Sequence, residues 1–352
     1  MADPVQITIF PEGLPEGLSR GGNGSEGKGL GLRGGQKVEG KVEVKALKDI
    51  EFGAFRIGFF WHTEGKGNRA SGGGGTDELS GEGRWRAGER VTYPFSVSAP
   101  WGPLSHDGKL LKVVWSLEAR VERSMLHSAI TEALPVFLEA DPEGRGHDLG
   151  PRPQKANELE AVKRGLGALW LTFGLVLTLG GIVLGALRGW DLYGVERWFL
   201  FVAMAGGFLL MLKGVWGRLG RGKLGEPSVQ LSTTEVRRGE EIRFSLALRP
   251  NQRTEVRTLD VILECEERVV HGHGQYQSHH RKTVFEQRLS LAEGLLIEPH
   301  RTLRKKGAVN LPGDAPTSFG APDNQVVWWL RFQADIVGWP DWKEPFLLTV
   351  RP

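Results

Sequence analysis

The chain has 352 residues, a length typical of two or three domains. Its hydrophobic content of 40% and charged content of 25% are ordinary for a folded protein, and its net charge of +3 is too small to predict nucleic-acid binding. Its one cysteine, Cys265, excludes an internal disulfide and is typical of a reducing compartment.

The first 150 residues predict a β-sandwich. In 34–44 a glycine-containing turn leads into alternating apolar and polar residues, and 52–61 places its aromatic and aliphatic residues on one face. Alternation of period two is typical of a strand with one face on a core and the other in water. After these strands, the polar, glycine-rich stretch 63–83 predicts a long flexible connection without regular structure.

One stretch of this half is repeated near the carboxyl end. Residues 103–121 are similar to residues 316–336, with no gap between the matched positions, and each is a turn followed by an alternating strand. The matched residues are Pro103, Ser105, Val113, Val114, Trp115 and Leu117, which correspond to Pro316, Ser318, Val326, Val327, Trp328 and Leu330. We therefore predict an internal duplication of two antiparallel sandwiches, with Trp115 and Trp328 as equivalent core residues and Trp329 on the solvent face.

Two apolar segments lie between the copies, at 165–187 and 198–217. The first carries no charge and, at about 1.5 Å per residue, reaches roughly 34 Å, enough to cross a bilayer core of roughly 30 Å. We predict a two-helix transmembrane hairpin, with a pair of buried core helices as the alternative. The residues expected at the membrane interfaces are Lys163, Arg164, Trp170, Trp190, Trp198, Lys213, Trp216 and Arg218.

Small residues at helical spacing lie in both apolar segments. Gly181 and Gly185 form one pair, and Ala203 and Gly207 form the other. Such pairs let two helices approach closely, so they predict helix packing within the hairpin and offer a route to homo-oligomers. The alternative is that glycine is simply common in membrane helices.

Basic residues set the predicted orientation. Arginine and lysine gather before the first apolar segment and after the second, which by the positive-inside rule places both flanks in the cytoplasm. The amino terminus has no signal-peptide pattern. We expect a sandwich at 1–150, juxtamembrane segments and the hairpin at 151–225, and a second sandwich at 226–352. The protein would lie in the inner membrane with both termini cytoplasmic.

Four histidines crowd one short stretch: His271, His273, His279 and His280. Imidazoles two residues apart share a strand face, and a hairpin would bring the pairs together, so zinc or nickel binding is one interpretation. The Gly, Gln and Ser around them favour an exposed turn without metal. The basic run 301–306 also has two interpretations. It either contacts anionic lipid or is an ordinary solvated loop.

The order of these strands resembles the arrestin-like family. "VEGKVEV", a strand that ends in "FFWHTEGKG" and "YPFSVSAPWGPLSHDGKLLKVVWSLEARV" are similar to its amino-terminal domain, and the part from "STTEVRRGEEIRFSLAL" to "EPFLLTV" is similar to its carboxyl-terminal domain. The resemblance is closest to uncharacterised bacterial arrestin-like membrane proteins. It implies tandem β-sandwiches that act as adaptors, binding proteins or lipids through loops and sheet edges. The Pro-Pro-x-Tyr motif of members that recruit ubiquitin ligases is missing around Tyr93, Tyr193 and Tyr276.

The sequence carries no catalytic motif, so we expect no enzyme activity and no cofactor. The predicted fold is mainly β: two arrestin-like antiparallel β-sandwiches joined by the transmembrane hairpin. The predicted function is that of a non-catalytic, membrane-anchored scaffold or adaptor that binds a protein partner at the cytoplasmic face, with the lipid bilayer as its second partner. Two alternatives are an accessory subunit of a transport or secretion complex acting through the hairpin, and a metal-responsive regulator acting through the histidine cluster.

Overall fold

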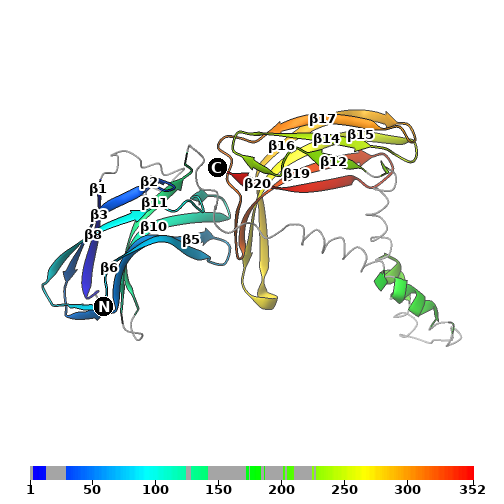
Figure 1. The fold of residues 1–352 in the computed structure, drawn as a ribbon. Coiled ribbons are helices and arrows are strands. Elements are labelled where there is room, and N and C mark those ends of the chain that lie inside the picture. Colours follow the sequence, from blue (N-terminus) through cyan, green and yellow to red (C-terminus); the bar gives the residue numbers. More distant parts are fainter. Residues whose placement is uncertain are drawn as a thin grey trace.

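The protein forms two β-sandwich-like domains that lie end to end (Figure 1). The structure is a computed structural model, and it describes residues 3–12, 29–123, 128–141, 172–173, 175–183, 186, 201–202, 204–209, 224–225 and 227–352. The chain is mainly β within these ranges.

The amino-terminal domain packs a three-stranded sheet against a six-stranded sheet. The small sheet has the order β1-β3-β8, made of β1 (Val5–Glu12), β3 (Lys37–Ala46) and β8 (Arg90–Ser98). The large sheet has the order β2-β11-β10-β5-β6, made of β2 (Leu30–Arg33), β11 (Ile130–Glu139), β10 (Leu111–Glu122), β5 (Ala54–Gly65) and β6 (Ser71–Ser80). Short strand β9 (His106–Asp107) pairs with β10, and β4 (Ile50–Phe52) pairs with β7 (Gly83–Trp85).

The carboxyl-terminal domain has the same arrangement. Its small sheet has the order β12-β14-β17, made of β12 (Ser228–Leu231), β14 (Glu241–Leu248) and β17 (Leu303–Asn310). Its large sheet has the order β13-β20-β19-β15-β16, made of β13 (Glu235–Arg237), β20 (Trp342–Arg351), β19 (Asn324–Ile336), β15 (Thr254–His271) and β16 (Ser278–Ile297). Strand β18 (Phe319–Ala321) pairs with β19, and the 3₁₀ turn η1 (Gly274–Tyr276) joins β15 to β16.

The repeated sequence is also a repeated structure. The indole Nε1 of Trp115 donates to the carbonyl oxygen of Pro103 at 2.7 Å, and that of Trp328 donates to the carbonyl oxygen of Pro316 at 2.8 Å. Both indoles are buried, with 1% and 0% of their surface exposed. Each copy therefore ties its preceding turn to a tryptophan in the middle of the core.

The serine of each copy joins the same turn to the last strand of its domain. Ser105 accepts a hydrogen bond from the backbone N–H of Leu138, and Ser318 accepts one from Val350, both at 2.9 Å. These contacts explain why proline, serine and tryptophan recur at the same spacing, since the three residues hold the turn against two strands.

Trp329 differs from the prediction. It lies on the outer face of the large sheet, as the alternation indicated, but only 5% of its surface is exposed. It packs with Val327 and Leu347, and the guanidinium carbons of Arg268 and Arg331 lie 5.1 and 5.8 Å from its ring centroid. The outer face of this sheet therefore buries an aromatic ring beneath arginine side chains.

The prediction of a flexible connection at 63–83 is wrong in its central part, where β6 pairs antiparallel with β5. The glycines that suggested a loop admit aromatic rings of the neighbouring strand. A Cβ added at Gly72 would lie 2.6 Å from Nε1 of Trp61, and one at Gly73 would lie 2.9 Å from Cδ1 of Phe60. Glycine is used here for close packing in a strand.

The prediction of a transmembrane hairpin is also wrong. Of the described residues, none belongs to a helix that is long and apolar enough to cross a membrane. The described helical residues include the stretches 175–183 and 204–209. The expected location at the inner membrane stays a prediction.

The residues that were assigned to the hairpin are only partly described. A Cβ added at Gly181 would overlap the side chain of Met204, so the two stretches touch at this glycine. Gly207 lies in the second stretch. The other predicted packing and membrane-interface residues lie outside the described residues: Gly185, Ala203, Lys163, Arg164, Trp170, Trp190, Trp198, Lys213, Trp216 and Arg218.

Candidate functional site

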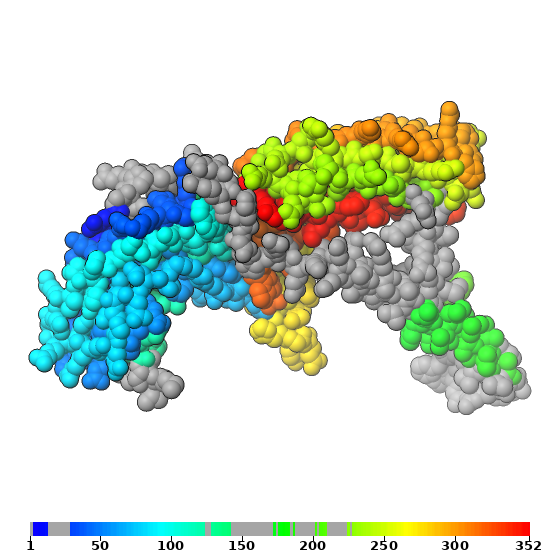
Figure 2. Space-filling model, viewed as in Figure 1, coloured from blue at the N-terminus to red at the C-terminus, as the bar shows by residue number. Residues whose placement is uncertain are grey.

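The two domains meet where turns of the amino-terminal domain contact the long β15–β16 hairpin. The turn at 66–70 follows β5, and the turn at 108–110 lies between β9 and β10. Both reach the hairpin near its outer end, whose tip stands clear of the two domains in yellow in Figure 2. This junction brings together side chains that are far apart in the sequence.

Asn68 of the first turn is held by backbone and side-chain groups of the second domain. Its Nδ2 donates to the carbonyl oxygen of Gly272 at 3.0 Å and to Oδ2 of Asp323 at 2.8 Å, and its Oδ1 accepts from the N–H of Gly272 at 3.0 Å. The backbone N–H of Asn68 donates to the carbonyl oxygen of Val270 at 2.8 Å. The carbonyl oxygen of Asn68 accepts a hydrogen bond from Nδ2 of Asn324 at 2.6 Å. Asn68 therefore forms hydrogen bonds with both the β15–β16 hairpin and the turn between β18 and β19.

Glu267 of β15 reaches the second turn, and its side chain is fully buried. Its carboxylate accepts hydrogen bonds from His106 Nε2 at 3.0 Å, from the N–H of Lys109 at 3.0 Å and from the N–H of Leu110 at 2.6 Å. Burial raises the pKa of this carboxyl group, but the hydrogen bonds from His106, Leu110 and Lys109 outweigh burial and lower it overall. Glu267 is therefore held as a carboxylate inside the junction.

Two glycines make this close approach possible. A Cβ added at Gly108 would overlap Oε1 of Glu267, and one at Gly67 would overlap Oδ1 of Asn324. An aromatic contact between the domains accompanies these polar contacts. The rings of Trp61 and Phe319 meet edge to face, with their centroids 5.8 Å apart.

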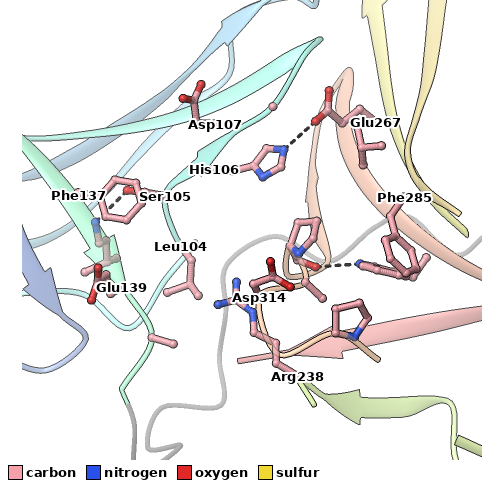
Figure 3. Close-up of a pocket in the computed structure, with 18 of the residues that line it drawn as sticks. Leu104, Ser105, His106, Asp107, Phe137, Glu139, Arg238, Glu267, Phe285 and Asp314 are labelled. Atoms are coloured by element: carbon pink, nitrogen blue, oxygen red, sulfur yellow. Dashed lines mark hydrogen bonds and ion pairs between the residues drawn. The ribbon is translucent and has the colours of Figure 1, made fainter. Parts of the chain in front are cut away.

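A cavity of about 760 Å³ opens beside the junction (Figure 3). Both domains line it, and its walls mix apolar rings with charged groups. Its lining residues include Leu104, His106, Gly108, Lys109, Phe137, Arg238, Glu267, Phe285 and Asp314. A concave site between two domains with a few converging polar groups has the features of a ligand-binding site.

Arg238 is a charged residue of this cavity that lacks an ion pair among the described residues. Its Nε is buried and has no hydrogen-bond partner, and its guanidinium forms no ion pair with any residue in the described ranges. Burial lowers the pKa of the guanidinium, an effect that the nearby Asp314 opposes. Figure 3 shows the guanidinium beside Asp314 and directed toward the amino-terminal domain. A partly buried cation loses hydration that no hydrogen-bonded anion replaces here, so an anionic partner would stabilise this group.

The apolar side of the cavity comes from both domains. Phe137 of β11 is 37% exposed and lies on the amino-terminal wall. Phe285 of β16 lies on the opposite wall, with its ring centroid 5.5 Å from that of Trp328. The cavity thus offers an exposed aromatic ring and a free guanidinium within one site.

The histidine cluster lies elsewhere, on the exposed tip of the hairpin. His279 pairs with Val270 and His280 with Val269 across the two strands. Within the described ranges, no group of three or more His, Cys, Asp or Glu residues is placed to hold a metal ion. His271, His273, His279 and His280 are therefore brought to one end of the hairpin without forming a metal site there.

The basic run 301–306 leads into β17, an edge strand of the small sheet. Arg304 and Lys306 are exposed, opposite Ala247 and Ser245 of β14. Contact of this run with anionic lipid stays a prediction.

The sequence analysis missed the residues of the junction, although one signal was present. Val261, Leu263 and Cys265 point to the core, and the next position on that face is Glu267. An acid on the buried face of an alternating strand indicates a specific polar partner. Asn68, Gly108 and Arg238 lie in turns or at a strand end, where no periodic pattern marks them.

No protein-family model matches the chain, and no curated protein matches it either. Among solved structures, part of the chain is similar to that of the sporulation control protein Spo0M from Bacillus subtilis, with 18% identity and a TM-score of 0.30. The match covers 36% of this chain and 49% of that one, so the chain spans about half the length of the solved protein. A likeness of this size bears on neither activity nor partners.

Proposed function

We propose that the chain is a non-catalytic adaptor of the arrestin-like type, and that it binds a protein partner in the interdomain cavity. Two copies of one sandwich topology, joined by a polar junction, support the family part of the proposal. Attachment through a transmembrane hairpin is no part of it, since no described helix could cross a bilayer.

The observation that carries the proposal is the unpaired guanidinium of Arg238 in the cavity that Phe137 also lines. A guanidinium pairs with carboxylates in a planar, two-bond geometry, and an exposed aromatic ring is a common anchor for an apolar side chain. We expect the partner to present an apolar residue beside an acidic one, because that pair would satisfy both groups of the cavity. A basic residue of the partner would be repelled by Arg238, which leaves an acidic residue as the one that could pair with the guanidinium.

The proposal is tested by site-specific cross-linking of the full chain in its own cells. A photoreactive phenylalanine analogue replaces Phe137, and a second protein carries the same analogue at Leu47, an exposed position outside the cavity. We expect position 137 to form a discrete protein cross-link that position 47 does not form. Arg238→Glu, which reverses the charge, should abolish that cross-link, whereas Arg243→Glu on the exposed small sheet should leave it unchanged.

Two results would contradict the proposal. A cross-link that forms equally from positions 137 and 47 would indicate nonspecific capture. A cross-link from position 137 that survives Arg238→Glu would show that the free guanidinium does not contribute to partner binding.

A further inference from the structure

Three hydrogen-bond donors converge at the β9–β10 turn of the amino-terminal domain. The backbone N–H groups of Lys109 and Leu110 both point at one oxygen of a carboxylate, and His106 Nε2 points at the other. Successive backbone N–H groups directed at one point form a concavity that binds anions. We call these donors, together with Gly108, the turn site.

The anion in the turn site comes from the other domain. Glu267 belongs to β15, and its side chain is completely buried against the turn. All donors of the site thus lie in one domain, and the ligand lies in the other. If the domains part, three donors exchange this acceptor for water, and each exchange costs about the net value of one hydrogen bond.

The shape of the turn site favours a carboxylate. Gly108 leaves room for Oε1 of Glu267, and a Cβ at that position would overlap both Oε1 and, at 2.5 Å, Nε2 of His106. The two carboxylate oxygens take donors from two directions, so both must be acceptors. An amide could keep its oxygen toward the two backbone N–H groups only by directing its NH₂ group at Nε2 of His106, which would then have to be the unprotonated nitrogen of the ring, and it would lose the charge-assisted hydrogen bonds of a carboxylate.

The turn site borders the interdomain cavity. His106, Gly108, Lys109 and Glu267 are among the residues that line the cavity. Figure 3 shows His106 and Glu267 facing each other on its upper side. A ligand in the cavity would therefore reach the turn site without displacing the core of either domain.

We propose that the turn site is a carboxylate-binding site in its own right, filled in this conformation by Glu267, and that an acidic side chain of a protein partner replaces Glu267 when the domains part. Partner binding at the turn site and docking of Glu267 there then exclude each other, so this contact is an alternative to partner binding in the intact interdomain cavity. By linkage, each weakens the other by the same factor. The identity of the replacing ligand as a protein rests on the proposed function, whereas the carboxylate-binding property of the turn does not.

Glu267→Ala in the full chain tests the site, with acetate as the probe. The substitution removes a CH₂ and a carboxylate, which acetate replaces closely in size and charge. The reporter of docking is hydrogen exchange at the amide of Asn68, which is bonded to Val270 across the junction. We expect exchange in the variant to be at least about tenfold faster than in the wild type, the factor that corresponds to one lost hydrogen bond.

Acetate at about 0.1 M, where the Debye length is about 10 Å, should restore protection of Asn68 in Glu267→Ala, while chloride at the same ionic strength should not. The amide resonance of Leu110 should shift with acetate in the same variant. Wild type should respond to neither salt, because Glu267 already fills the site.

Two further variants separate binding at the turn from a general loss of folding. Glu267→Gln keeps the side-chain volume, so it should lose protection at Asn68 and gain nothing from acetate. Gly108→Ala fills the site with a methyl group and should behave in the same way. Exchange at Val44, in the amino-terminal core, should stay slow in every variant that is folded.

The proposal is overturned if acetate protects Asn68 in Glu267→Ala no better than chloride, or if Glu267→Gln responds to acetate as Glu267→Ala does. Neither result depends on a partner protein. A missing cross-link at position 137 would instead contradict the proposed function while leaving the acetate response in place.

Discussion

The two domains share one topology but differ in the strands that meet at the junction. In the amino-terminal domain the paired strands β5 and β6 have 12 and 10 residues. Their counterparts β15 and β16 have 18 and 20 residues, although β10 and β19 are nearly equal at 12 and 13. The added length forms the hairpin that carries Glu267 to the other domain. A duplicated sandwich thus becomes a two-domain unit by extending one hairpin in one copy.

The outer faces of the two large sheets also differ at equivalent positions. In the amino-terminal domain Ser116 lies opposite Phe60, and the guanidinium carbon of Arg120 lies 3.6 Å from the centroid of that ring. In the carboxyl-terminal domain Trp329 lies opposite Glu264. The aromatic ring lies on β5 in the first domain and on β19 in the second. In both domains an arginine side chain lies over it. The outer face therefore keeps an aromatic–arginine contact, although the residues that form it lie at different positions in the two domains.

The largest expected effect tests the similarity of the two cores. Trp115→Ala and Trp328→Ala should each destabilise their own domain by about 3–5 kcal/mol, because each removes a buried indole and its hydrogen bond to proline. Chemical denaturation followed by limited proteolysis measures this loss domain by domain. If either variant unfolds both domains in one transition, the junction makes the protein a single cooperative unit.

The second effect tests the difference between the outer faces. Trp329→Ala should cost about 2–4 kcal/mol, since the ring is buried, whereas Ser116→Ala at the equivalent position should cost less than about 1 kcal/mol. Trp329→Phe should be nearly neutral, because Nε1 of Trp329 has no hydrogen-bond partner to lose. Denaturant midpoints of the three variants give the order. A loss for Trp329→Phe as large as for Trp329→Ala would show an unrecognised partner of the indole.

The third effect concerns the junction itself. Gly108→Ala should weaken domain docking by about 1–3 kcal/mol, because the added methyl group overlaps the carboxylate of Glu267. Gly53→Ala is the matched control, since a Cβ there would meet no atom within 4 Å. Small-angle scattering of the full chain reports the separation of the domains. Equal scattering from the two variants would mean that the turn at 108–110 adjusts to the added methyl group without weakening domain docking.

The smallest effect is a dependence on pH. The pKa of Glu267 is lowered in the folded protein, so its stabilising contribution is complete above the pKa of the unfolded state, about 4.3, and is lost as the pH falls through the folded value. Docking should therefore weaken below about pH 4.3, by an amount on the order of 1 kcal/mol. The protection of the Asn68 amide, which is its exchange rate relative to that of an unstructured amide at the same pH, measures this loss between pH 7 and pH 3. Glu267→Gln should show no acid-dependent change, and an unchanged acid response would assign the effect to another group.

Much of the fold could be predicted from alternation and from the repeated sequence. Proline, serine and tryptophan recur at one spacing because each copy needs the same contacts, so the duplication is visible in the sequence. The strand that contains Gly72 and Gly73 could not be predicted, because the sequence does not distinguish a glycine that makes room for an aromatic ring from a glycine in a loop. The prediction for 165–187 was wrong because it rested on a charge-free composition alone, and composition does not by itself fix a membrane-spanning helix.

The candidate site was harder to predict than the fold. Glu267 was visible as an acid on a buried strand face, but its donors are backbone groups, which leave no trace in residue identity. Asn68 and Arg238 act through positions in turns that depend on how the domains meet. Contacts between domains of one chain come from tertiary placement, and no local pattern records them.

The junction joins two unlike surfaces, a turn of one domain and a hairpin of the other, so it is heterologous in the sense used for protein assemblies. A heterologous contact made within one chain can also be made between chains, and repeated head to tail it has no built-in end. Linkage within one molecule raises the effective concentration of each surface at the other, so the internal contact dominates in dilute solution. Crowding of many copies to a comparable local density would let the same asparagine and glutamate join neighbouring molecules into a chain.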